Sequence, residues 1–176
     1  MPILKEEIYT IEDIYALPDG ERAELIDGNL YMMTPPGTRH QRLVSKVHGS
    51  IFRFIEDHGG DCEVFPAPFG VFLSEDSEYV EPDVTVVCDP SRLDEKGCHG
   101  APDWVMEVVS PSSRRLDYFI KLFKYRTEGV REYWIVDPQK DRVTVYEFEK
   151  DEGNEYSLRD VVPVGIFENL EIRFEE

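Results

Sequence analysis

The sequence predicts a single α/β (α+β) domain, residues 1–176, built on a mixed β-sheet that is flanked by helices. Its length allows one sizeable hydrophobic core without disulfide or metal staples. A composition of 41% hydrophobic and 12% aromatic residues is typical of a packed globular fold. Strand-like alternation dominates the middle of the chain, and two longer segments with apolar residues at helical spacing interrupt it.

The elements expected in the N-terminal half follow from cap and turn residues and from apolar spacing. Thr10 and Asp13 have the spacing of a capping box, so a short helix is expected over 11–17. The Asp-Gly pair at 27–28 lies between two alternating segments and predicts a hairpin. A long helix is expected over 38–58, because its apolar residues recur at helical spacing and two glycines follow it. The two hairpin strands are expected at 22–26 and 29–33.

The C-terminal half continues with strands, one helix and a second hairpin. Ser112 or Ser113 can cap a helix that ends near Gly129. We expect its apolar stripe to pack against the core. The stripe consists of Leu116, Phe119, Ile120 and Phe123. The strand-like segments lie within 62–73, 80–89, 103–110, 131–136 and 142–148, a loop of turn-forming residues is expected over 90–102, and the tail is expected to add edge strands.

Charge is unevenly distributed along the chain. The formal net charge of −18 opposes nonspecific attraction to nucleic acid, because that attraction comes from basic groups that neutralise phosphates. Residues 34–48 nevertheless carry basic residues and no acid, and residues 111–131 carry more basic than acidic residues. Either solvated helix faces or a binding surface would account for this segregation.

The cysteines and the apolar segments bear on the cellular compartment. Cys62, Cys88 and Cys98 are an odd number without C-x-x-C spacing, so we expect structural, unpaired thiols. No apolar run approaches the roughly 20 residues of a membrane span, and the first ten residues lack the apolar core of a signal peptide. These features predict a cytoplasmic protein.

Two consecutive core strands each carry a carboxylate in an unfavourable place. Asp83 begins "DVTVV", after Pro82, and Glu107 lies inside "WVMEVV". A carboxylate on an apolar strand is costly unless it is paired, hydrogen-bonded or bound to a metal. Two such groups on neighbouring strands can converge on one cation, and hard oxygen ligands suit Mg²⁺. Glu81, by contrast, is expected to face solvent.

A cation on the following helix would complete such a site. Lys121 lies on a different face of the helix from the apolar stripe, where it could orient an attacking water or stabilise charge that develops on phosphate. The spacing is also compatible with a simple Asp117–Lys121 pair at i,i+4 on a solvated face. Spacing alone favours the second interpretation.

Three segments carry a resemblance to a known family. The strand "EPDVTVV", the strand "WVMEVVSPSSRR" and the passage "KLFKYRTEGVREYWIVDP" resemble the Uma-type restriction endonuclease family, a branch of the PD-(D/E)XK nuclease superfamily. The opening "AELIDGNLYMMTPPGTRHQRLV" is similar to that family as well, so the resemblance covers roughly residues 10 to 150. It implies a restriction-endonuclease-like core with a bent, mixed sheet, extra terminal β-hairpins, and Mg²⁺-dependent cleavage of phosphodiester bonds, with Mn²⁺ as a substitute.

The resemblance also implies roles for individual residues. Asp83 would be the motif aspartate and Glu107 the second acidic ligand, with the carbonyl of Val108 as a third metal ligand. The usual lysine two residues after the second acid is replaced here by Val109. Lys121 from the next helix would take over its function, with Lys124 as the second candidate. Glu24 would help to hold metal-bound water. The residues implied to contact nucleic acid are His40, Arg39, Arg114, Arg115 and Lys124.

Three functions follow as alternatives. The favoured one is an endonuclease acting on nucleic acid, with DNA as the expected substrate and a homodimer as the expected assembly. The second is a noncatalytic interaction or regulatory protein that retains the nuclease fold, which the net charge of −18 favours. The third is a hydrolase of a smaller phosphate ester.

Overall fold

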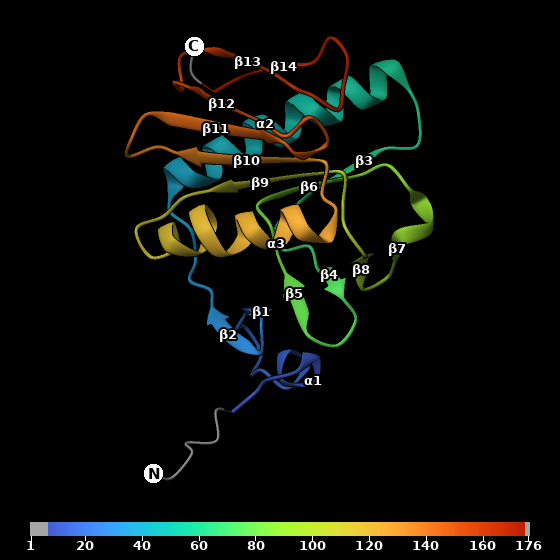
Figure 1. Ribbon diagram of the computed structural model, residues 1–176, viewed down its shortest axis with the longest axis vertical. Helices are drawn as coiled ribbons and strands as arrows, with labels where there is room; N and C mark the ends of the chain where they lie inside the picture. The colour runs from blue at the N-terminus through green and yellow to red at the C-terminus, as the bar shows by residue number, and fades with distance from the viewer. Residues whose placement is uncertain (1–6, 175–176) are drawn as a thin grey trace.

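The computed structural model describes residues 7–174 and has a central six-stranded mixed sheet between two helices (Figure 1). Helix α2 (Thr38–His58) covers one face of this sheet. The segment formed by a π-helical turn η2 (Leu116–Ile120) and helix α3 (Lys121–Glu128) covers the other. In spatial order the sheet contains β12 (Glu152–Tyr156), β11 (Arg142–Glu147), β10 (Glu132–Asp137), β9 (Trp104–Val108), β6 (Val84–Val87) and β3 (Glu63–Pro66).

Side chains of the central strands alternate between the two faces. On β9, Trp104 and Met106 pack in the core beneath α2, whereas Val105 packs in the core beneath α3. Glu107 follows the same alternation and therefore faces α3. Strand β10 runs parallel to β9, and η2 with α3 forms the connection between them. This β-α-β unit places the helix directly over the face that carries Glu107.

A second six-stranded sheet lies beside the α3 face of the first. Its strand order places β1 next to β5, so the N-terminal hairpin lies close to the segment that leads into β6. The strands, in spatial order, are β2 (Asn29–Met32), β1 (Ala23–Ile26), β5 (Glu78–Val80), β4 (Val71–Ser74), β8 (Gly97–His99) and β7 (Leu93–Asp94). The tail adds a small two-stranded sheet of β13 (Val161–Pro163) and β14 (Glu171–Arg173), which packs near α2.

The fold class and the main elements predicted from the sequence are confirmed. Helix α1 (Ile11–Tyr15) begins at Thr10, whose backbone N–H donates to Asp13 Oδ2 at 2.7 Å, as a capping box requires. The β1–β2 hairpin turns at Asp27 and Gly28, both of which have positive φ. Helix α2 has the predicted bounds 38–58 and buries its apolar side chains. Among the described residues, no helix is both long enough and apolar enough to cross a membrane.

One expectation about packing was wrong. Phe119 and Phe123, two members of the expected core stripe, are 70% and 64% exposed. The helix instead turns Asp117, Lys121 and Tyr125 toward the sheet. In a π-helical turn the hydrogen bond spans five residues, as from Lys121 N–H to the Leu116 carbonyl, so the faces are rotated relative to a regular α-helix.

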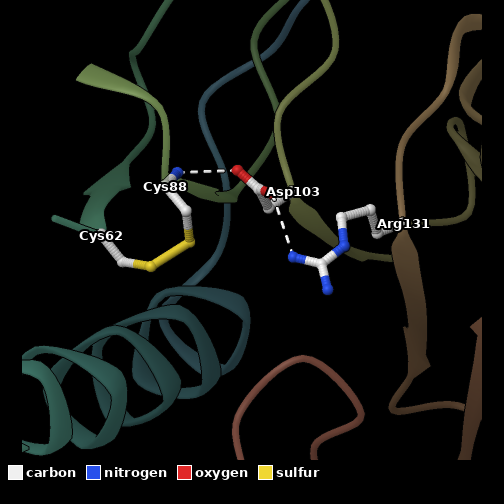
Figure 2. Close-up of a disulfide and its surroundings, with 4 residues drawn as sticks. All are labelled: Cys62, Cys88, Asp103 and Arg131. Atoms are coloured by element: carbon white, nitrogen blue, oxygen red, sulfur yellow. Dashed lines mark hydrogen bonds and ion pairs between the residues drawn. A yellow bond between two sulfur atoms is a disulfide. The ribbon is translucent and has the colours of Figure 1, made fainter. Parts of the chain in front are cut away.

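Two local expectations also differ from the structure. The loop expected over 90–102 contains the short strands β7 and β8. The cysteines were expected to be unpaired, but Cys62 and Cys88 form a disulfide. In the β3–β6 ladder Glu63 lies opposite Val87, so the next residues outward are opposite each other and their Cα atoms are 3.8 Å apart. The backbone N–H of Cys88 donates to Asp103, which also pairs with Arg131 (Figure 2).

Candidate active site

Asp83 and Glu107 lie side by side on adjacent strands. Val84, the first residue of β6, is opposite Met106 of β9, so the residue before the strand lies next to Glu107. The backbone N–H of Val108 donates to Asp83 Oδ2 at 2.7 Å. This hydrogen bond orients the Asp83 carboxylate at the mouth of the strand, and the side chain remains 15% exposed.

Lys121 connects carboxylates from separate elements. Its Nζ lies 2.8 Å from Glu107 Oε1 on β9 and 2.8 Å from Glu24 Oε2 on β1. Asp117 Oδ1, one helical turn before it, is 3.7 Å from Nζ. The lysine side chain is only 4% exposed, so the interpretation as an i,i+4 pair on a solvated face is wrong.

The backbone between β5 and β6 holds Glu24 in place. The N–H of Glu81 donates to Glu24 Oε1 at 2.9 Å, which links β1 to the segment that precedes Asp83. The Glu81 side chain itself is buried, accepts from Tyr79 OH at 2.8 Å and pairs with Arg22. The expectation that Glu81 faces solvent was therefore wrong, because the hairpin brings Arg22 to it from a distant part of the chain.

Sequence reasoning missed Tyr125 as a member of the cluster and placed Asp117 on a solvated face. Tyr125 is fully buried, and its hydroxyl donates to Glu107 Oε1 at 3.0 Å. Asp117 is buried with its Oδ1 atom lacking a hydrogen-bond partner, and its carbonyl accepts from Tyr133 OH at 2.8 Å. The signal available in the sequence was the spacing of Asp117, Lys121 and Tyr125 at i, i+4 and i+8, which places three polar groups on one helical face.

More carboxylates than cations are buried in this cluster, and this imbalance shifts the pKa values of its members. The pKa of Glu107 is raised well above its usual range, because burial disfavours the charged form and Asp117, Asp83 and Glu24 add repulsion that Lys121 only partly offsets. Burial also raises the pKa of Asp117 to about 6. For Lys121 burial acts in the opposite direction, but the surrounding carboxylates prevail and raise its pKa well above the ordinary value.

His40, in the first turn of α2, reaches the Asp83 carboxylate from the helix side. Its Nε2 lies 3.2 Å from Asp83 Oδ2, and the ring also interacts with the backbone of Val108. Burial would lower the pKa of His40, but the hydrogen bond and charge of Asp83 outweigh it, so the pKa is raised. His40 is therefore directed at Asp83 and Val108, which are two of the three expected metal ligands.

The other residues expected to contact nucleic acid are more dispersed. The Arg114 guanidinium binds Asp137 and Gln139 at the end of β10. Lys124 binds Asp27 and Glu78 rather than joining Lys121. The side chains of Arg39 and Arg115 are exposed.

The donor atoms near Asp83 fit a hard divalent cation by their chemistry. Among residues 7–174, no group of three or more His, Cys, Asp and Glu side chains is arranged to hold a metal. Mg²⁺, however, commonly takes one or two carboxylates and completes its octahedron with water. Two carboxylates on adjacent strands and an excess of buried negative charge are chemically compatible with that preference. Asp83, Glu107 and Val108 are the residues that would hold the ion.

Comparison with known proteins identifies the family of this chain. A family model described as "Putative restriction endonuclease", Uma2, matches residues 10–173. This chain belongs to the Uma2 family. The match includes β1, β6, β9 and α3, the elements that contribute Glu24, Asp83, Glu107 and Lys121.

Curated relatives and a solved structure are consistent with the Uma2 assignment. The chain is 28% identical over 135 residues to the uncharacterized protein slr1290 of Synechocystis, which covers 76% of this chain and 70% of that protein. It is 26% identical over 130 residues to sll1609 of the same organism, covering 72% of each. A crystal structure from Anabaena variabilis, described as "a putative nuclease belonging to DUF820", superposes with a TM-score of 0.72 at 22% identity, over 89% of both chains. This similarity shows that the chain has a nuclease-like fold.

Proposed function

We propose that this protein is a magnesium-dependent endonuclease that hydrolyses phosphodiester bonds in DNA. The observation that carries the proposal is the convergence of Lys121 with Glu107 and Glu24, beside Asp83, from four separate elements of a nuclease-like fold. Burying an ammonium group among carboxylates is costly to build, and perturbed, buried clusters of this kind concentrate at functional sites.

Each residue has a part in the proposed reaction. Asp83, oriented by the Val108 N–H, and Glu107, oriented by Tyr125, present carboxylate oxygens to the cation. When bound, the cation would polarise the phosphoryl oxygen and lower the pKa of a bound water. Lys121 is positioned by Glu24 and Glu107 to stabilise negative charge on the phosphate or to orient the attacking water. His40 contacts Asp83 and is the residue of α2 that would touch the substrate phosphate.

The direct test is cleavage of supercoiled plasmid, linear duplex and RNA with Mg²⁺, Mn²⁺ or EDTA. We expect metal-dependent cleavage of DNA by the wild type and its loss in Asp83→Asn. Asp89→Asn is the matched control, because Asp89 lies beyond the other end of β6 and is 52% exposed. Equal cleavage by the wild type and Asp83→Asn would overturn the assignment. Sedimentation of the active protein would test the expected homodimer.

A noncatalytic binding protein is the second candidate. It is favoured by the net charge of −18 and by the pairing of Arg114 and Lys124 with carboxylates of the protein itself. Calorimetric titration with Mg²⁺ separates the two functions. The endonuclease requires Mg²⁺ binding that Glu107→Gln weakens, whereas a noncatalytic protein with a degenerate site would show no Mg²⁺ binding that depends on Glu107.

A further inference from the structure

The exposed side of α2 carries cations in a region without acids. Residues 28–55 contain no Asp or Glu, although 37 of the 176 residues of the chain are acidic. Arg42, Lys46 and Arg53 are separated by four and seven residues, so they lie along one line of the helix, within an arc of about 40°. We call these three residues the α2 stripe. Leu43, Val47 and Ile51 anchor the adjoining side of α2 in the core, which holds the stripe on a rigid element.

The cations of the α2 stripe differ from most other basic side chains in the structure. None of the three forms an ion pair with an acidic residue in the described part of the chain, residues 7–174. Ion pairs with carboxylates of the protein are made by Arg22, Arg92, Arg114, Lys121, Lys124, Arg126, Arg131, Arg142 and Lys150. In so acidic a protein, three aligned cations without acidic partners are complementary to an external polyanion.

The α2 stripe begins two residues after His40, at the end of α2 that contacts the candidate active site. His40, on the first turn of the same helix, lies 3.2 Å from Asp83. The acid-free region ends at Glu56 and Asp57, at the opposite end of α2. At a rise of 1.5 Å per residue, Arg42 to Arg53 spans about 17 Å, which corresponds to about five phosphates of one strand at 3.4 Å each.

We propose that the α2 stripe binds the phosphate backbone of double-stranded DNA and guides it to Asp83. This proposal rests on the endonuclease function and specifies its substrate as a duplex. A straight, rigid row of cations matches the regular backbone of a duplex. Three such contacts provide affinity and register without reading sequence.

The test compares two triple variants that remove the same charge. Arg42→Gln/Lys46→Gln/Arg53→Gln removes the α2 stripe, and Lys96→Gln/Lys140→Gln/Lys150→Gln removes three exposed lysines from elsewhere on the surface. Binding of a fluorescent 20-base-pair duplex is measured by anisotropy in EDTA at several salt concentrations, with folding checked by circular dichroism. We expect the first triple variant to bind at least about tenfold more weakly, with a slope of log K against log salt reduced by about 2 to 3 units. The second should bind as the wild type does.

Three results would overturn the proposal: wild-type affinity in the α2 variant, equal loss in both variants, or tighter binding of a 20-nucleotide single strand than of the duplex. The use of EDTA separates this test from that of the endonuclease function, because binding is measured without cleavage. If the wild type binds duplex through the α2 stripe but cleaves no DNA with Mg²⁺ or Mn²⁺, the binding surface stands and the endonuclease proposal fails.

Discussion

Replacing Lys121 by Met tests whether the buried lysine holds the candidate active site together. The substitution keeps much of the side-chain volume but removes the only ammonium group that contacts Glu24, Glu107 and Asp117 among the described residues. These three carboxylates are 3%, 6% and 2% exposed, so water cannot readily replace the lost charge. Removing one partner of a buried ion pair costs about 3–5 kcal/mol, because it leaves an uncompensated buried charge.

We therefore expect Lys121→Met to lower the free energy of unfolding at pH 7 by about 3–5 kcal/mol. In a chain of this size that corresponds to a fall in Tm of about 10 °C. The loss should shrink at lower pH, because Glu107 and Asp117, whose pKa values are raised by burial, then take up protons and need no counter-charge. Adding Glu107→Gln to Lys121→Met should recover part of the stability, because it removes one of the unpaired charges.

Urea denaturation followed by circular dichroism measures these differences. Arg126→Met is the matched control, because Arg126 pairs with Asp151 on the surface, where both side chains are more than half exposed. A surface pair of this kind contributes less than about 1 kcal/mol. If Lys121→Met costs no more than Arg126→Met, the lysine is not a buried counter-charge, and the reasoning about the cluster is refuted.

Three other predictions concern single interactions. Tyr125→Phe removes the hydrogen bond to Glu107 and should destabilise the protein by about 1.5–3 kcal/mol in urea denaturation, and an unchanged midpoint would contradict the role of the hydroxyl. For Asp137, burial acts to raise the pKa, but the hydrogen bonds from Arg114 and Tyr118 outweigh it, so the pKa is lowered. The ionised Asp137 therefore contributes its full stabilisation of the fold above the ordinary aspartate pKa of about 3.9, and this contribution is lost as the pH falls. Asp137→Asn should accordingly flatten the acid side of a plot of stability against pH, and an unaltered slope would exclude this ion pair as a cause. Reducing the Cys62–Cys88 disulfide, which closes a loop with a sequence separation of 26, should cost about 3 kcal/mol, with the double variant Cys62→Ser/Cys88→Ser insensitive to dithiothreitol.

Local sequence was sufficient for much of the fold. The bounds of α2 follow from apolar spacing and the glycines after His58, and the first hairpin follows from the Asp-Gly turn, because these signals act between residues a few positions apart. Asp83 and Glu107 stood out for a similar reason, since a carboxylate within an apolar strand is unusual by itself. The proximity of these two residues was also expected from their strands, β6 and β9, which follow each other along the chain within the central sheet and pair there.

The buried face of α3 could not be inferred in the same way. Hydrophobic spacing favoured Phe119 and Phe123, but both are exposed. Lys121 is buried because Glu24, 97 positions earlier, and Glu107, 14 positions earlier, converge on it. The free energy of that arrangement depends on contacts between segments that are distant in the sequence, and a local pattern of residues cannot predict such contacts. The π-helical turn then rotates the face of the helix relative to regular α-helical spacing.

The sequence by itself determined the elements, the family and the two carboxylates at adjacent strands. The tertiary structure decided which partners the charged groups have: Lys121 among three acids, Glu81 with Arg22, and Cys62 with Cys88. The physical reason is the separation along the chain of the residues that interact. Turns, caps and periodicity arise from neighbours along the chain, whereas the pairing of a buried charge or a thiol depends on which distant segments the sheets bring together.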